Sequence, residues 1–169
     1  MLKKALWLFV AAMVAPAQAG VSRAYLEKQA ELVAHKHGIP GKTLKAICAR
    51  ESSWNPNAVG PVGEIGLCQL RPTTVALMKG KDWRADLSEA ERLKLIEKEL
   101  FDPRTNLHWA ARYIKMMIKE ADGDVTLAIA AYNAGPGIIR YVKRVRTSIA
   151  EFEEAERVPL ARLETAGAF

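Results

Sequence analysis

The spacing of apolar residues predicts a chain built mainly of amphipathic helices. Apolar positions recur every three or four residues between clear stop signals, which is the period of a helix with one buried face. Each predicted helix follows a cap residue or a proline and stops at a turn that contains glycine, proline or asparagine. The predicted helices cover residues 22–37, 43–53 and 72–78, a segment capped by Ser88, a segment begun by Asp102 and Pro103, residues 125–132, and a long last helix from about residue 138.

Residues 58–70 break this period. The stretch "AVGPVGEIG" holds three glycines and a proline in nine residues, a composition typical of a loop or a short hairpin. No linker divides the chain after residue 20. The predicted fold class is therefore α+β but predominantly α, with one helical domain over residues 20–169 and a small irregular or β-hairpin element near residues 58–70.

The last predicted helix carries an apolar stripe of its own. We expect this stripe to face the core of the domain, with the charged run "KRVR" on the opposite, solvated face. The stripe consists of Tyr141, Val142, Val145 and Ile149.

Two polar residues stand where helical periodicity places a core residue. Glu51 continues one apolar stripe and Tyr132 continues another, each in the last turn of its helix. The preceding stripe residues are Leu44, Ile47 and Cys48 in one helix and Val125, Ala128 and Ile129 in the other. A carboxyl that is partly withdrawn from water has a raised pKa and can act as a general acid, which a facing tyrosine can orient. The alternative is that Glu51 pairs with Arg50 or Lys45, or extends into solvent.

The first nineteen residues resemble an export signal. Two lysines precede an apolar run over residues 5–15, and "AQA" at 17–19 is a typical cleavage site. The run is shorter than the roughly 20 residues that span a membrane. We therefore predict a signal peptide at residues 1–19 and a periplasmic or secreted mature chain, without a cysteine near the cleavage site for lipid attachment.

Charge and cysteines fit an exported protein. Loss of Lys3 and Lys4 with the signal peptide reduces the formal charge from +6 to +4. A moderately basic exported protein fits an anionic cell-wall polymer better than a nucleic acid, and a solvated basic surface without a partner is equally compatible. Cys48 and Cys68 would enter an oxidising compartment, where they either form a disulfide or stay buried as thiols.

No metal or cofactor is expected from the sequence. His35 and His37 lie on different faces of their helix and His108 stands alone, so no third ligand accompanies them. The glycines of "GPVGEIG" lack the strand-then-helix context of a phosphate-binding loop.

Four segments together resemble the soluble lytic transglycosylase family, whose members have a goose-type-lysozyme-like fold and cut peptidoglycan. They are "ARESSWNPNA", "GEIGLCQLRPTT", "DPRTNLHWAARYI" and "AIAAYNAGPG", in this order. The resemblance implies cleavage of the β-1,4 bond between N-acetylmuramic acid and N-acetylglucosamine without water, which leaves a 1,6-anhydro end. It implies that one glutamate performs both proton transfers, and by motif position this glutamate is Glu51.

The resemblance also implies roles for other residues. Tyr132 would orient the catalytic glutamate, and Gln69 would bind a sugar N-acetyl group. Ser52, Asn133 and Tyr113 match motif positions near the substrate, although a backbone bond, a turn contact and core packing are their respective alternatives.

The chain departs from the family pattern in ways that bear on the site. Cys48 and Cys68 replace residues that are commonly apolar, which favours a disulfide between them. Gly60 stands where some relatives have serine. Most glycosidases use two carboxylates, and Glu64 is the only credible second one here, at a position where many relatives have a small residue. The segment 79–100 is longer than the usual connection.

The sequence thus predicts a monomeric peptidoglycan lytic transglycosylase, an accessory that opens the wall for a secretion or conjugation machine. Two other functions remain open. One is a hydrolytic muramidase on the same fold, in which Glu64 places a water. The other is a non-catalytic glycan-binding or assembly-scaffold protein.

Overall fold

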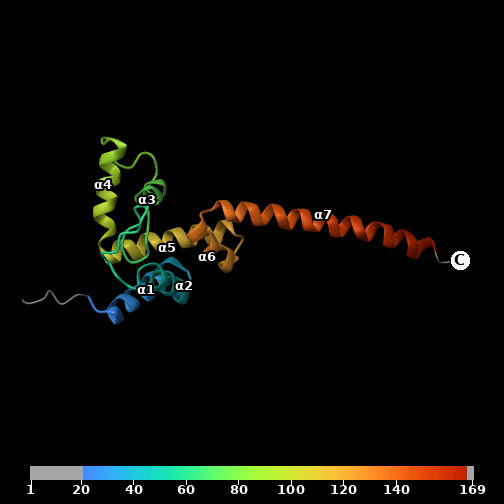
Figure 1. The fold of residues 1–169 in the computed structure, drawn as a ribbon, viewed down its shortest axis with the longest axis horizontal. Coiled ribbons are helices and arrows are strands. Elements are labelled where there is room, and N and C mark those ends of the chain that lie inside the picture. The colour runs from blue at the N-terminus through green and yellow to red at the C-terminus, as the bar shows by residue number, and fades with distance from the viewer. Residues whose placement is uncertain (1–20, 167–169) are drawn as a thin grey trace, which may run out of the picture.

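The computed structural model describes residues 21–166, and the side chains of residues 21–154. The predicted signal peptide at residues 1–19 lies outside the described residues. Seven helices form within this part of the chain (Figure 1). They are α1 (Arg23–His37), α2 (Gly41–Ser52), α3 (Pro72–Lys79), α4 (Glu89–Leu100), α5 (Pro103–Glu120), α6 (Val125–Ala134) and α7 (Gly137–Ala166).

The helix ends follow the capping residues that the sequence predicts. The Ser22 side chain caps α1, which ends at Gly38 in the left-handed conformation. Ser88 and Glu91 form the predicted capping box at the start of α4. Asp124 accepts a hydrogen bond from a backbone N–H in the first turn of α6. Local chemistry therefore sets these boundaries to within one or two residues.

Residues 58–70 form the small non-helical element that the sequence predicts. It contains two isolated antiparallel bridges, one joining Val59 to Ile65 and one joining Ile65 to Leu70. The described residues contain no longer β-ladder. The fold is therefore mostly helical with a minimal β element, as predicted.

The core is organised around α5. This helix contacts α1, α2, α4 and α6, while α3 packs on α4 (Figure 1). Its inward face combines large side chains with two adjacent alanines, Ala110 and Ala111, which leave room for a neighbouring helix to approach closely. The buried apolar residues of α5 are Leu107, Trp109, Ala110, Ala111, Tyr113, Ile114 and Met117.

The buried face of α6 differs from the predicted one. The sequence analysis placed Ile129 inward, but 41% of its surface is exposed. Leu127 and Ala131 are buried instead, beside Ala128. Nearly every residue of α6 is apolar, so its periodicity does not define one face. Packing against α5 and α7 selects the face that is buried.

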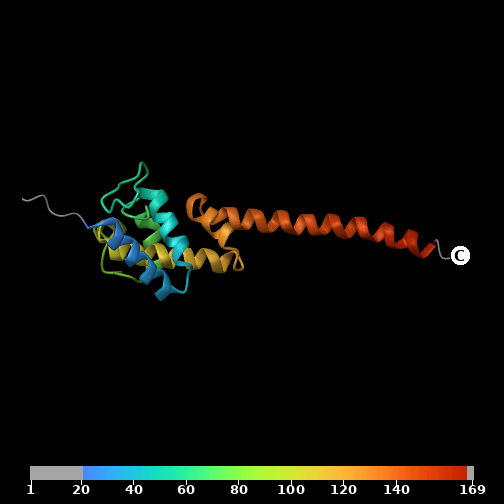
Figure 2. The same cartoon turned by 90° about the horizontal axis from the view of Figure 1, so that it is seen from below.

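The prediction for the last helix is wrong beyond its first turns. Ile139 is buried, and Ile138 and Val142 pack against the core. Tyr141, Val145 and Ile149 are exposed, because α7 runs away from the body of the domain and no other element lies beside it (Figures 1 and 2). None of the helices within residues 21–166 has the length and apolar character needed to cross a membrane.

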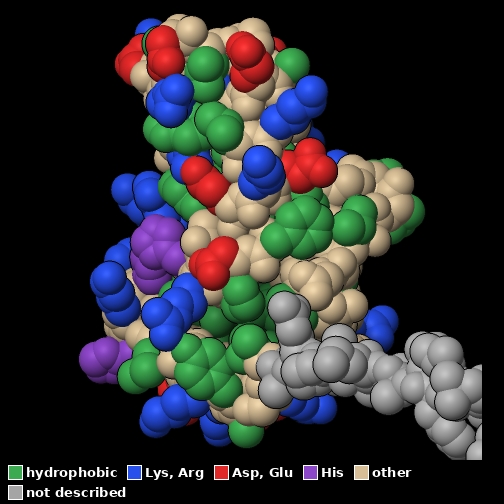
Figure 3. All heavy atoms as spheres, turned by 90° about the vertical axis from the view of Figure 1, so that its left-hand side faces the viewer, with side chains coloured by type: hydrophobic (Ala, Val, Ile, Leu, Met, Phe, Trp, Pro, Cys, Tyr) green, Lys and Arg blue, Asp and Glu red, His purple; other side chains and the backbone are tan. Residues whose placement is uncertain are grey.

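The surface opposite the projecting helix is mixed in charge. Figure 3 shows acidic side chains gathered toward the end formed by α4 and basic side chains dominating the end formed by α1. On this face no single charge sign covers the whole surface, so the formal excess of positive charge is spread rather than concentrated.

The two cysteines form the disulfide that the family resemblance favours. Cys48 of α2 is bonded to Cys68, 20 residues further along the chain. Replacing both cysteines with alanine should lower the free energy of unfolding by about 3 kcal/mol, because the unfolded chain regains the entropy of an open loop. Urea unfolding measures this difference. Leu77→Ala, at a side chain that is 83% exposed, serves as a control. A double variant within about 0.5 kcal/mol of the parent would contradict the prediction.

Candidate active site

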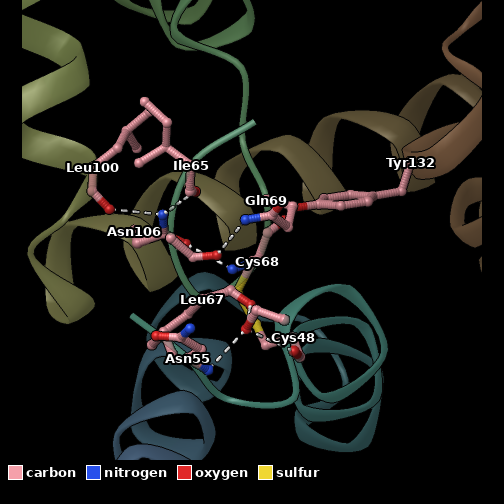
Figure 4. Close-up of a disulfide and its surroundings, with 11 residues drawn as sticks. Cys48, Asn55, Ile65, Leu67, Cys68, Gln69, Leu100, Asn106 and Tyr132 are labelled. Atoms are coloured by element: carbon pink, nitrogen blue, oxygen red, sulfur yellow. Dashed lines mark hydrogen bonds between the residues drawn. A yellow bond between two sulfur atoms is a disulfide. The ribbon is translucent and has the colours of Figure 1, made fainter. Parts of the chain in front are cut away.

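Cys68 joins the loop of residues 58–70 to three helices. Its side chain is bonded to Cys48 of α2. Its N–H donates to Oδ1 of Asn106 on α5 at 3.0 Å, and its carbonyl accepts from the hydroxyl of Tyr132 on α6 at 2.7 Å (Figure 4). The side chain, the N–H and the carbonyl of this one buried residue therefore all help to fix the position of the loop.

Asn106 of α5 is fully buried and binds the same loop. Its Nδ2 donates to the carbonyls of Ile65 at 2.8 Å and Leu100 at 2.9 Å (Figure 4). Gly66 lies directly against this amide with φ of 78°, so a side chain there would collide with Asn106 and with the Leu100 carbonyl. The sequence analysis missed Asn106. A polar residue on the buried face of α5, one position before Leu107, was the available signal.

Glu51 lies at the end of α2, where that helix meets a cleft of about 600 Å³. The carboxyl is half-buried, as its place on an apolar stripe predicts. The cleft brings together five of the residues singled out from the sequence, and Ser52 is not part of its lining. The lining residues are Glu51, Pro61, Glu64, Gln69, Leu70, Arg71, Thr74, Tyr113, Tyr132, Asn133, Ala134, Gly135 and Pro136.

The environment of Glu51 favours its protonated form. Burial raises the pKa of the carboxyl above its ordinary value, because the charged form loses hydration. Arg50 partly offsets this rise, and the negative charge of Glu64 adds to it. The predicted alternative, a glutamate neutralised by Arg50, is therefore outweighed by desolvation.

Glu64 lies in the same cleft, and its pKa is displaced in the opposite direction. Its carboxylate accepts hydrogen bonds from Nε of Arg71 at 3.0 Å and from the N–H of Val62 at 3.2 Å. Burial alone would raise its pKa, but bonds from its own backbone, from Arg71 and from Val62 lower the pKa below the ordinary value. The cleft therefore pairs a carboxyl of raised pKa with one of lowered pKa, a combination often found at catalytic sites.

Gly60 leaves space in the cleft for the side-chain oxygens of Glu64 and Gln69, which both lie close to it. A Cβ at this position would lie 2.5 Å from Oε2 of Glu64 and 2.7 Å from Oε1 of Gln69. A serine at this position would therefore displace one or both side chains. The glycine and the Glu64 carboxylate are thus structurally linked departures from the family pattern.

Gln69 is locked in position by its own amide nitrogen. Its backbone has φ of 48°, and Nε2 donates to the carbonyls of Ala58 at 3.2 Å and Gly66 at 3.0 Å. Oε1 takes part in no hydrogen bond with the described residues. The amide thus presents a fixed acceptor to the cleft.

Tyr132 is fixed to the loop by its own proton. Its hydroxyl donates to the Cys68 carbonyl, which leaves the hydroxyl oxygen for the predicted contact with Glu51. Burial raises the pKa of Tyr132 well above its ordinary value, with further contributions from the nearby charges of Glu51 and Tyr113. The hydroxyl oxygen is therefore a neutral acceptor next to Glu51. The rings of Tyr113 and Tyr132 pack with centroids 5.3 Å apart.

The remaining predicted site residues divide between support and lining. Ser52 Oγ donates to the Leu67 carbonyl at 2.7 Å and accepts from the N–H of Asn55 at 3.1 Å, so it supports the loop from outside the cleft. Asn133 is exposed and lines the cleft, as does the largely buried Tyr113. Trp54 is buried in the core beneath this loop.

A histidine pair on another face was also missed from the sequence. Nε2 of His37 and Nδ1 of His108 lie 3.0 Å apart, although the residues are 71 positions apart. Burial lowers the pKa of both imidazoles, and the cations Arg112 and Lys36 lower both further. No third metal-binding side chain joins them among residues 21–154.

Comparison with known proteins gives a consistent set of relatives. The soluble lytic murein transglycosylase of Salmonella typhimurium is 33% identical over 99 residues, covering 56% of this chain and 14% of the relative. That of Escherichia coli (strain K12) is 32% identical over 102 residues, covering 60% of this chain and 15% of the relative. The chain thus spans about a seventh of the length of these relatives.

A solved structure extends the likeness to the fold. The lytic transglycosylase Slt of Pseudomonas aeruginosa matches with a TM-score of 0.53 and 30% identity, covering 70% of this chain and 17% of that one. The sequence profile of the Transglycosylase SLT domain matches residues 29–153, which include every residue that lines the cleft. The chain belongs to the Transglycosylase SLT domain family.

Proposed function

We propose that this chain is a peptidoglycan lytic transglycosylase with Glu51 as its single acid and base. The observation that carries this proposal is a half-buried carboxyl of raised pKa on the wall of a cleft of about 600 Å³. The relatives are named for action on murein, the wall polymer. The solved Pseudomonas structure is titled an inactive mutant in which one glutamate is replaced by glutamine, which supports a catalytic glutamate in this family.

The proposed reaction moves one proton through Glu51 in two steps. The protonated carboxyl first donates to the glycosidic oxygen as the bond from the muramyl anomeric carbon breaks. The resulting carboxylate then takes the proton of the muramyl C6 hydroxyl, whose oxygen bonds to the anomeric carbon. The products are a 1,6-anhydro end and a free sugar hydroxyl, and no water is consumed. Intramolecular attack makes a second activating carboxylate unnecessary.

The state of Glu64 argues against a hydrolytic muramidase. A general base that activates water needs a carboxylate of sufficient basicity. Arg71 and the N–H of Val62 hold the pKa of Glu64 low, so this carboxylate is a weak base. In our proposal Glu64 instead acts through its charge, which helps Glu51 to remain protonated.

The other cleft residues suit sugar binding. Gln69 Oε1 is a fixed acceptor for the N–H of an N-acetyl group, since its Nε2 is committed to the backbone. The Tyr132 oxygen can accept a hydrogen bond from the Glu51 carboxyl while its own O–H donates to the Cys68 carbonyl. Tyr113 and Asn133 complete the wall against which a sugar would lie. Ser52 supports the loop and has no direct substrate role in this proposal.

We also propose that the enzyme acts outside the cytoplasm, without a metal or cofactor. The predicted signal peptide at residues 1–19 and the disulfide Cys48–Cys68 support an oxidising compartment. A domain over residues 20–169 suits an accessory that opens the wall locally for a secretion or conjugation machine. Fusing residues 1–19 to a periplasmic reporter tests the export step.

The role of Glu51 predicts a large loss of activity in Glu51→Gln. Removal of the only proton donor should reduce the rate of peptidoglycan cleavage about 100-fold to 10,000-fold. Mass spectrometry of the digest should show anhydromuramyl ends from the parent. Reducing muramyl ends would contradict the lyase assignment, and a variant that cleaves as fast as the parent would contradict the role of Glu51. A parent that cleaves no peptidoglycan would identify a scaffold rather than an enzyme.

The charge of Glu64 predicts a shifted pH profile. Only the protonated form of Glu51 can begin the reaction, so activity falls as pH rises through the Glu51 pKa. Glu64→Gln removes a negative charge and leaves Arg71 unpaired, and both effects lower the Glu51 pKa. The alkaline limb of the rate profile should therefore move to lower pH. Glu97→Gln, on the exposed face of α4, should leave the limb in place, and an unmoved limb in Glu64→Gln would contradict the coupling.

The raised pKa of Glu51 also predicts a stability effect. Between the ordinary pKa and the raised folded-state pKa, the folded chain binds more protons than the unfolded chain, so stability falls as pH rises through this window. Glu51→Gln should therefore be more stable than the parent near neutral pH and equal to it below the ordinary glutamate pKa. Urea unfolding at both pH values measures this, and a variant that is less stable at neutral pH would contradict it.

A further inference from the structure

The projecting part of α7 carries an unpartnered apolar face. Four large side chains at spacings of four, four and three residues share one side of the helix. They are Tyr141, Val145, Ile149 and Phe152, with 56%, 39%, 51% and 71% of their surface exposed. These residues lie along the segment that leaves the body of the domain (Figure 2).

Only the base of this helix is held by the rest of the chain. Ile139 is buried, and two ion pairs tie the next turns to the loop before α6, Lys143 to Asp122 and Arg146 to Asp124. Beyond them no described element packs on α7 (Figures 1 and 2). A single helix in water is only marginally stable, and most helical stability comes from packing of an apolar face. The stripe is therefore placed to receive a partner.

On α7 the charged side chains that the structure describes, up to residue 154, fall into two groups, here called the basic half and the acidic half. Basic side chains occupy the turns up to residue 146, and acidic side chains occupy the turns that follow. The basic residues are Arg140, Lys143, Arg144 and Arg146, and the acidic ones, all exposed, are Glu151, Glu153 and Glu154. Such a helix complements a copy of itself that runs in the opposite direction, because each basic half then lies beside an acidic half.

We propose that α7 docks antiparallel on α7 of a second copy of this chain, with the two-fold axis near Thr147. In this register Val145 packs beside Ile149 of the second copy, and Tyr141 lies within one residue of the level of its Phe152. Arg144 and Glu151 lie on the same flank of the helix, about 100° from the stripe by the helical rotation of 3.6 residues per turn. The register therefore sets Arg144 within one residue of the level of Glu151 of the second copy, twice per dimer.

Other occupants fit this face less well. A parallel copy would place the basic halves together and the acidic halves together, which is repulsive. An anionic membrane surface would attract the basic half but repel the three glutamates, whereas membrane-surface helices are typically basic along the whole polar face. An antiparallel copy places an opposite charge beside the basic half and beside the acidic half of α7. It replaces the sequence-based expectation of a monomer, and it does not depend on the proposed chemistry of Glu51.

Sedimentation velocity of the purified chain over a range of concentrations tests self-association. The parent should move from the mass of one chain toward that of two as concentration rises. Val145→Glu combined with Ile149→Glu should remain a monomer at every concentration, with unchanged peptidoglycan cleavage. Leu77→Glu, at an exposed apolar residue on α3, should dimerise like the parent. A parent that stays monomeric throughout would overturn the proposal.

Charge exchange at one predicted contact tests the antiparallel direction. Arg144→Glu and Glu151→Arg should each weaken dimerisation, because each sets like charges side by side. The double exchange should restore it, because the opposite charges face each other again. In a parallel dimer the double exchange would only interchange two repulsive contacts. Failure of the double variant to recover would overturn the antiparallel register.

Salt and lipid distinguish the remaining occupants. Attraction between opposite charges is screened by salt, so dimerisation of the parent should weaken as salt is raised, whereas a parallel pair would strengthen. Vesicles of phosphatidylglycerol provide the membrane probe. Loss of vesicle binding in the Val145→Glu, Ile149→Glu variant, with a parent that remains monomeric, would assign the face to a membrane and contradict the second copy.

Discussion

The position of Cys68 is the constraint on which the cleft depends. This residue is bonded covalently to α2, through its N–H to Asn106 of α5, and through its carbonyl to Tyr132 of α6. The regular β structure within residues 58–70 consists of only two isolated bridges, so bonds to the neighbouring helices are needed to fix the loop. Because α2 and α6 both pack against α5, the loop is tied to the same group of helices that carries Glu51 and Tyr132.

The electrostatics of the cleft follow from this geometry. The loop holds Glu64 against Arg71 at one wall, and the end of α2 holds Glu51 half-buried at another. Glu51 is partly desolvated, whereas Glu64 accepts hydrogen bonds, so the pKa of Glu51 is raised and that of Glu64 is lowered. The raised pKa makes Glu51 easier to protonate than an ordinary glutamate, as its proposed role of acid and base requires.

Much of the fold could be predicted because its signals are local. Cap residues such as Ser22 and Ser88 act within one turn, and the glutamate on the α2 stripe was visible from periodicity alone. The departure of Cys48 and Cys68 from the residues that are common in the family favoured their pairing. These features need only neighbouring residues, or a pattern shared by relatives.

The missed features depend on contacts between distant segments. Asn106 satisfies carbonyls 6 and 41 residues away, and the Tyr132 hydroxyl donates to a residue 64 positions away. The buried face of α6 is chosen by its neighbours, since its composition is apolar all round. The exposure of the α7 stripe, including Ile149, follows from the direction in which the helix leaves the domain, which its own sequence does not encode.

The central claim is that one cleft holds two carboxyls whose pKa values are displaced in opposite directions. A pH titration of the side-chain carboxyl carbons by NMR, with Glu51→Gln and Glu64→Gln used to assign the signals, measures this directly. The account predicts that Glu51 titrates above the ordinary glutamate pKa and Glu64 below it. A Glu51 signal that titrates at or below the ordinary value would contradict the account.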